Sequence, residues 1–170
     1  MAVSLYSFVP MYRRVIETAA HLLAKGKAHA AAHDISEADM LAWTLAEDML
    51  PLSFQLAVVR NFSLGWTARA ADLPVPEAVI GAEMNMEAFE AAFAEAIAAL
   101  DAMTADQFAG RDEASITFKI GDIMEPTLPA GQWITGFATT NIYFHLSMIY
   151  AILRMKGVAL GKLDMFPAGL

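Results

Sequence analysis

The sequence contains no cysteine, which excludes disulfides, thiolate metal ligands and thiol nucleophiles. Any chemistry must therefore use oxygen and nitrogen groups. Proline and glycine are scarce, with 7 and 10 occurrences in 170 residues, while alanine, leucine and methionine are plentiful. This composition favours helices over a β-sandwich or a repeat array. The length and the hydrophobic content of 57% suffice for one substantial core, so residues 1–170 are predicted to form a single domain.

Positive charge is also in short supply. The chain has 11 basic residues against 19 acidic ones, a formal net charge of −8, and no concentrated basic patch. Such a surface repels a phosphate backbone and an anionic bilayer. Neither nucleic-acid binding nor adsorption to a membrane is expected.

Two segments bear on location. The N-terminus lacks a basic region leading into a long apolar run, so no signal peptide is apparent and cytoplasmic residence is expected. Residues 126–153 carry no formal charge and are long enough to raise a transmembrane interpretation. Gln132, Asn141 and His145 interrupt this run, and two prolines break its start. A buried bundle helix is therefore the favoured interpretation, with a membrane segment as a weaker alternative.

Apolar residues recur with helical spacing along most of the chain. A short helical piece is predicted at residues 40–47, and Asp48 is in place to cap the helix that follows. Pro51 then falls in the first turn, where a missing amide hydrogen costs little. The long helices are predicted at residues 7–32, 49–71, 83–103 and 132–156.

The link between the third and fourth long helices differs in character. Its segment "SITFKIGDIMEPTL", residues 115–128, has β-branched and aromatic residues on either side of Gly-Asp, which predicts a small hairpin. Gly157 follows two basic residues, as at a helix C-terminus. The predicted fold is all-α, an antiparallel four-helix bundle with a small β-hairpin before the last long helix.

Asn141 and His145 are the most distinctive polar pair, four residues apart in the last long helix. Residues at that spacing can present two ligand atoms to one ion. The alternative is a buried histidine satisfied by a hydrogen bond to asparagine, tyrosine or water, and spacing alone favours it. Both residues are predicted to point inward, because they belong to a stripe that comprises Trp133, Phe137, Asn141, Phe144, His145, Met148 and Ile152.

Four other polar residues are candidates. His29 and His33 have the spacing of a ligand pair, but His33 is expected at a helix C-terminus, where partial negative charge favours a cation without a metal. Asp48 is either an N-cap or a carboxylate ligand or general base near His29 or His145. Gln55 has an inward amide or is an ordinary hydrogen-bonding side chain.

Several strong motifs are absent from the sequence. There is no Glu-x-x-His, as carboxylate-bridged di-iron bundles require, and no His-Glu-x-x-His. The phosphate-binding loop, the dinucleotide-binding glycine motif and the Gly-x-Ser-x-Gly nucleophile elbow are also missing.

Four segments carry a resemblance to a known family: residues 27–30 (KAHA), 46–55 (AEDMLPLSFQ), 141–154 (NIYFHLSMIYAILR) and 156–166 (KGVALGKLDMF). The last two are the most specific. Over nearly its whole length the chain resembles the DinB-like (DinB/YfiT) superfamily of metal-dependent four-helix-bundle proteins, in a bacterial branch whose domain has no assigned function. The resemblance implies a homodimer.

That resemblance also implies a ligand set from which this sequence departs. Metal-binding members use one histidine from the second helix and a His-x-x-x-His pair from the fourth. Here the pair is Asn141 and His145, and the second long helix contains no histidine. Asp48 and Gln55 are both candidates for the missing ligand. A set of histidine, asparagine and carboxylate binds zinc and nickel more weakly than three histidines.

The sequence is therefore compatible with two functions. In the first, Asn141, His145 and Asp48, with His29 nearby, hold a divalent ion such as Zn, Ni or Mn weakly and support small-molecule transferase or hydrolase chemistry, which the resemblance implies by analogy. In the second, the protein is a non-catalytic dimeric bundle whose polar residues are structural or line a small-ligand pocket.

Overall fold

The computed structural model describes residues 4–167 and 169. Four long helices form the body of the protein: α1 (Phe8–Ala32), α3 (Leu52–Ala71), α4 (Met86–Asp101) and α6 (Thr139–Met155). The shorter elements are η1 (Leu5–Ser7), α2 (Glu37–Leu41), η2 (Gly81–Glu83), η3 (Ala105–Phe108), β1 (Ser115–Thr117), β2 (Thr127–Pro129), α5 (Ala130–Gln132), η4 (Trp133–Ala138) and η5 (Lys162–Met165). The predicted all-α four-helix bundle with a small hairpin is confirmed.

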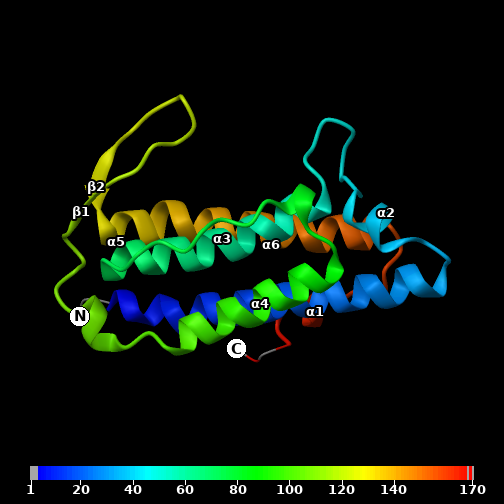
Figure 1. Ribbon diagram of the computed structural model, residues 1–170, viewed down its shortest axis with the longest axis horizontal. Helices are drawn as coiled ribbons and strands as arrows, with labels where there is room; N and C mark the ends of the chain where they lie inside the picture. The colour runs from blue at the N-terminus through cyan, green and yellow to red at the C-terminus, as the bar shows by residue number, and fades with distance from the viewer. Residues whose placement is uncertain (1–3, 168, 170) are drawn as a thin grey trace.

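The helices lie in two layers, with α3 and α6 above α1 and α4 in the view of Figure 1. Within each layer the two helices are antiparallel. An extended segment, residues 72–80, runs back along α3, so that α4 starts near the beginning of α3 and runs in the same direction (Figure 1). We call this segment the strap.

Helix α3 is the most enclosed element, because it packs against α1, α4 and α6. Sixteen of its 20 residues are buried, including Leu56, Val59 and Trp66. A helix that is apolar on all sides is the expected sequence pattern for such a position.

The strap is held to α3 by side chains that bond to its backbone. Asn61 Nδ2 donates to Val79 O at 2.9 Å, and Val79 N donates to Asn61 Oδ1 at 3.0 Å. Arg60 Nη1 donates to Glu77 O at 2.7 Å. The amide of Asn61 thus pairs with Val79 much as a neighbouring strand would.

The hairpin is placed as the Gly-Asp signal predicts. Its strands pair in an antiparallel register with Ile116 opposite Leu128, and a bridge between Ile120 and Met124 closes the turn. Trp133 Nε1 donates to Ile116 O at 2.8 Å, which fastens the hairpin to the start of the last helical stretch.

That last stretch is helical without a break from Ala130 to Met155, but residues Trp133–Ala138 form a π-helical segment. The Thr139 hydroxyl donates to Ile134 O at 2.7 Å and lies 2.8 Å from the buried hydroxyl of Tyr12. The wider turns of a π-helical segment rotate the helix face, so residues before the segment and after it do not follow one regular α-helical spacing.

The predicted start of α3 is wrong, and so is the proposed role of Asp48 as its cap. Because a residue before proline disfavours the α conformation, Leu50 cannot continue a helix into Pro51. The helix begins at Leu52 with Pro51 as its N-cap residue, and Asp48 is exposed in the preceding loop. We call residues 42–51 the α2–α3 loop.

Two other helix starts differ from the predicted ones, because a capping side chain fixes each of them. The short helix is Glu37–Leu41 rather than residues 40–47, since Ser36 Oγ accepts a hydrogen bond from Asp39 N at 3.0 Å. Helix α4 starts at Met86 rather than at residue 83, because Asn85 Oδ1 accepts from Ala88 N at 2.9 Å.

Gly157 ends the last helix with a φ of +91°, which confirms its predicted role at the C-terminus. Among the described residues, no helix has both the length and the hydropathy that crossing a bilayer requires.

The segment after Gly157 is fastened to α1 through Asp164. Its Oδ1 accepts from Lys25 Nζ at 2.7 Å and lies 2.9 Å from His21 Nε2, while its Oδ2 accepts from Gly161 N at 2.7 Å. The Lys25 ammonium, followed by the His21 bond and the backbone bond, holds the pKa of Asp164 well below its usual range. The carboxylate of Asp164 is therefore ionised in the folded protein at neutral pH.

Replacing that carboxylate tests the attachment. Because the pKa of Asp164 is depressed in the folded protein, its stabilising contribution is present above the unfolded value of about 4 and is lost as pH falls below it. Asp164→Asn should lower the free energy of unfolding by about 1 kcal/mol at pH 7, after allowance for solvent screening. Denaturant titrations of both proteins at pH 7 and pH 3 measure the difference. If Asp164→Asn lowered the free energy of unfolding equally at pH 7 and pH 3, the role assigned to the charge would be wrong.

Candidate functional site

Gln55 in the first turns of α3 and His145 in α6 form a direct pair across the bundle. His145 Nδ1 lies 2.7 Å from Gln55 Oε1, and Gln55 Nε2 donates to Leu50 O at 2.9 Å. A carbonyl oxygen can only accept, so the amide nitrogen of Gln55 must face Leu50 and its oxygen must face His145. The proton of the imidazole is therefore on Nδ1.

This tautomer leaves the other ring nitrogen of His145 with a free lone pair. Burial lowers the pKa of His145 below its ordinary value, so the ring is neutral at pH 7. None of the described residues forms a hydrogen bond with Nε2. Buried side-chain atoms without a partner do occur among the described residues, but Nε2 is not one of them, so it has surface exposed to solvent. Nε2 is thus an unprotonated acceptor that solvent can reach.

Asn141 lies one helical turn before His145, and both are half-buried. Its Nδ2 donates to Phe137 O at 3.3 Å, which leaves Oδ1 without a hydrogen bond from the described residues. The amide that orients His145 comes from Gln55 instead. Of the polar residues in the predicted site, the structure brings these three onto one face between α3 and α6.

Aromatic rings flank the imidazole. The ring of Phe54 lies 5.9 Å from that of His145, and the ring of Phe144 lies 5.2 Å away, both edge-on. Phe144 is 53% exposed, so its predicted inward orientation is wrong. Of the predicted stripe, Trp133 and Ile152 at its two ends are fully buried. From residue 138 on, the other fully buried residues of this helical stretch belong to a neighbouring stripe, which comprises Ala138, Ile142, Leu146, Ile149 and Leu153. The sequence is apolar on both faces, so periodicity alone did not identify the buried residues in the middle of this helical stretch.

His29 and Asp48 lie elsewhere. The ring of His29 stacks on His33 at 4.1 Å near Gly157, which follows His145 by 12 residues, or about 18 Å of helix. His33 Nδ1 lies 2.8 Å from His29 O, which agrees with the C-terminal role expected of His33. Asp48 is exposed in the α2–α3 loop, and neither carboxylate oxygen has a hydrogen bond to a described residue.

These donors do not fit a tightly held transition-metal ion. The described part of the chain contains no group of three His, Cys, Asp or Glu side chains placed to hold a metal. The site offers one imidazole nitrogen and the amide oxygen of Asn141, while the oxygen of Gln55 is already occupied by the His145 proton. Zinc, nickel and manganese sites require stronger or more numerous donors.

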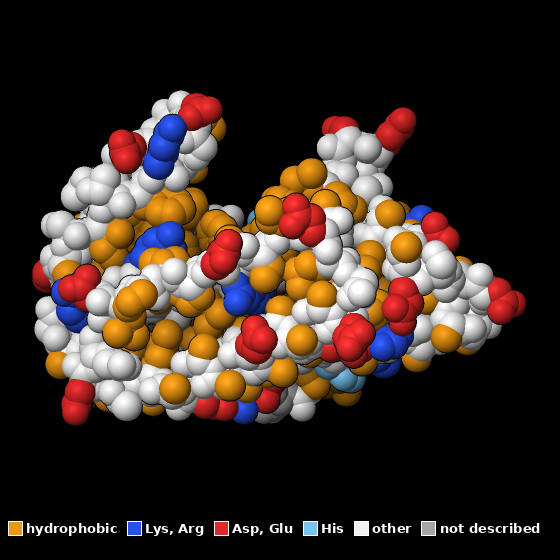
Figure 2. Space-filling model, in the orientation of Figure 1, with side chains coloured by type: hydrophobic (Ala, Val, Ile, Leu, Met, Phe, Trp, Pro, Cys, Tyr) orange, Lys and Arg blue, Asp and Glu red, His pale blue; other side chains and the backbone are white. Residues whose placement is uncertain are grey.

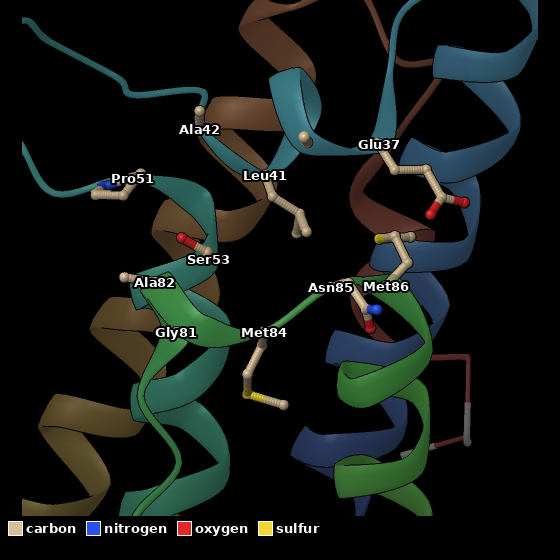
Figure 3. Close-up of a pocket in the computed structure, with 11 residues that line it drawn as sticks. Glu37, Leu41, Ala42, Pro51, Ser53, Gly81, Ala82, Met84, Asn85 and Met86 are labelled. Carbon is tan, nitrogen blue, oxygen red and sulfur yellow. The ribbon is translucent and has the colours of Figure 1, made fainter.

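A separate cavity of about 360 Å³ lies between α2, the start of α3, η2 and the start of α4. Figure 3 shows the side chains of Leu41, Met84 and Met86 around this space, with the carboxylate of Glu37 at one side. Its lining is mainly apolar and includes none of the five predicted site residues. Gly81 is needed there, because an added Cβ would collide with the backbone carbonyl of Ser53.

Comparisons with known proteins place the chain in a family. Residues 5–166 match the family described as Domain of unknown function (DUF1993). The protein belongs to this family. The structure of this DUF1993 protein also resembles the crystal structure of a DinB family member protein from Shewanella denitrificans, with a TM-score of 0.83 and 23% identity, over 95% of this chain and 90% of the other. The predicted DinB-like fold is thereby confirmed. No curated protein sequence matches the chain.

Sequence reasoning missed two parts of this site. The carbonyl of Leu50 that fixes Gln55 has no sequence signal, because any residue can supply it. Phe54 and Phe144 were visible as aromatic neighbours of the polar residues. Only the pairing of α3 with α6 brings them to one imidazole ring.

The neutral state of His145 predicts a dependence of stability on pH. Since its pKa is lowered on folding, the unfolded chain takes up a proton first as pH falls below about 6.5, and the free energy of unfolding decreases until pH reaches the lowered value. His145→Gln should be less stable than wild type by about 1 kcal/mol at pH 8, because the bond to Gln55 is altered. At pH 5 the difference in the free energy of unfolding between the two proteins should be smaller. Denaturant titrations at the two pH values measure it. A gap that stays constant or widens on acidification would contradict the prediction.

Proposed function

We propose that this DUF1993 protein is a metal-independent binding protein that offers the unprotonated Nε2 of His145 to a small molecule with an O–H or N–H donor. The ligand docks on the open face between the hairpin and the α2–α3 loop. Figure 2 shows this face hollowed between two projections, with hydrophobic side chains along the hollow. Apolar contacts with Phe54 and Phe144 accompany the polar one.

The observation that carries this proposal is the chain of hydrogen bonds from Leu50 O through Gln55 to His145 Nδ1. A partner on one ring nitrogen selects the tautomer and the orientation, and so defines what the other nitrogen can do. Here the atom that remains unpaired faces solvent, and a neutral ring can also act as a general base at pH 7.

A second candidate is weak binding of a divalent ion. Asn141 Oδ1 and His145 Nε2 belong to residues four apart on one helix, and neither atom bonds to another described residue. Two neutral donors give low affinity. Under this candidate, DinB-like hydrolase or transferase chemistry would follow only with a third ligand from the substrate or solvent.

The metal content of the wild type and of a variant with two added histidines separates the two candidates. Purified wild type should contain no stoichiometric metal, and its thermal midpoint should not rise with zinc, nickel or manganese. Gln55→His combined with Asn141→His should gain about 2.7 kcal/mol of stability at an ion concentration 100 times its dissociation constant. Elemental analysis and thermal melts measure both.

The control variants are His145→Ala and Asn141→Ala. Near-stoichiometric metal in wild type that is lost from both would overturn the metal-independent proposal. The ¹⁵N shifts of the His145 ring supply a second readout: a protonated Nε2 at pH 7 would overturn it as well, whatever the metal content.

The homodimer implied by the resemblance stays a prediction. Sedimentation of the purified protein should give twice the chain mass of 18.4 kDa. A species of the single chain mass at micromolar concentration would contradict it.

A further inference from the structure

Arg69 in the last turn of α3 is a half-buried cation that no carboxylate of a described residue contacts. Its Cζ lies 5.4 Å from the ring centroid of Trp66 and 5.0 Å from that of Phe118. No hydrogen bond or ion pair joins its guanidinium to another residue in the part of the chain that the structure describes. Burial lowers its pKa without removing its charge. Its five N–H groups therefore have no acceptor among the described residues.

The backbone is shaped to let the guanidinium lie there. Gly65 occupies the preceding turn of α3, and an added Cβ would meet Arg69 Nη1 at 2.8 Å. The guanidinium thus lies back over the glycine, close to Trp66, instead of extending into water. Glycine inside a helix is unfavourable compared with alanine, so close approach of another group is its usual explanation.

Two cavities meet at Arg69. One of about 200 Å³ is walled by the strap and by aromatic rings, and its lining includes Phe62, Trp66, Val75 and Phe118. The other, of about 310 Å³, is more polar and has the hydroxyl residues Ser115 and Thr117 of β1 in its wall. Arg69 and Val75 line both.

The charge around these cavities is opposite to that of the protein. The whole chain has a formal net charge of −8, yet the described residues that line the aromatic cavity include Arg69 and no acidic side chain. In the polar cavity the one acidic residue, Asp72, lies 3.3 Å from Arg111 Nη1. Figure 2 shows basic side chains set among hydrophobic ones on this face, beside the hairpin. A local positive potential on an acidic protein favours an anionic ligand.

We propose that this cleft binds a small aromatic carboxylate. The ring enters the cavity beside Trp66 and Phe118, and the carboxylate accepts two parallel hydrogen bonds from the free edge of the Arg69 guanidinium. A cavity of about 150 Å³ holds a benzene ring, so the aromatic cavity fits one ring and not a fused system with large substituents.

This site is distinct from the one at His145. Arg69 follows Gln55 by 14 residues on the same helix, about 21 Å along its axis. The Arg69 cleft recognises its ligand by charge, whereas the proposed ligand of His145 donates a hydrogen bond to a neutral ring nitrogen. The two proposals can therefore fail independently.

Calorimetric titration with benzoate is the test, because it is a single ring with one carboxylate. Benzamide has the same shape without the charge, acetate has the charge without the ring, and phenyl phosphate replaces the carboxylate. Benzoate should bind at least tenfold more tightly than the other three. Equal binding of benzamide would overturn the role of the charge, and tighter binding of phenyl phosphate would overturn the choice of carboxylate.

Variants then locate the site. Arg69→Met should weaken benzoate binding at least tenfold, while Arg154→Met, an arginine in the last turn of α6, should leave it unchanged. Arg69→Lys keeps the charge without the fork and should fall between wild type and Arg69→Met. Benzoate affinity that is unaltered in Arg69→Met would overturn the proposal, as would a wild type that binds no benzoate at millimolar concentration.

Gly65→Ala gives a test that does not depend on removing the arginine. The new methyl group displaces a flexible guanidinium and not backbone, so the helix should keep or raise its thermal midpoint. Benzoate affinity should nevertheless fall at least fivefold. A variant that melts as wild type does and binds benzoate equally well would show that the guanidinium position is unimportant, and the proposal would be wrong.

Discussion

Helix α3 is buried on nearly every side, and this burial determines how the segments around it are held. A polar group in such a helix costs free energy unless it finds a partner. Gln55 reaches a loop carbonyl and an imidazole, Arg60 and Asn61 reach the strap, and Thr67 donates to the carbonyl of Ser63 in its own helix. The bonds of Gln55, Arg60 and Asn61 also fix the segments that supply their partners. Among the described residues, Arg60 Nε and Ser63 Oγ stay buried in α3 without a partner.

Both candidate sites follow from this arrangement. The α2–α3 loop is held at Leu50 by the same amide that orients His145, so the tautomer of the imidazole and the position of the loop are set together. At the other end of α3, the strap that Asn61 anchors forms one wall of the cavity next to Arg69. The amide of Gln55 is shared between the carbonyl of Leu50 and the imidazole of His145. The N–H groups of Arg69, in contrast, are all available to a ligand.

The fold was largely predictable because its signals are local. The period of α1 and the Gly-Asp turn of the hairpin each lie within a few residues, and the resemblance to DinB-like bundles agreed with both. The start of α3 could not be predicted from residue type. Asp48 is a residue type that often caps helices, but Pro51 decides the boundary by its effect on Leu50. The candidate site was partly predictable. His145 and Gln55 could be named as candidates, but they lie 90 residues apart, and only the packing of α3 on α6 makes them partners. Arg69 was missed because a single arginine in a helix is ordinary until its surroundings are known.

The pairing of Asn61 with Val79 restricts how this chain can change in length. The amide bonds to both backbone groups of one residue, and Arg60 bonds to the carbonyl two residues earlier. An insertion or deletion between residues 77 and 79 would put the wrong backbone groups opposite these side chains. A change before residue 77 would be absorbed by the exposed stretch that follows α3. Natural variation in the length of this connection is therefore expected to collect on the side nearest the aromatic cavity, where it would alter the size of the cavity and leave the bundle intact.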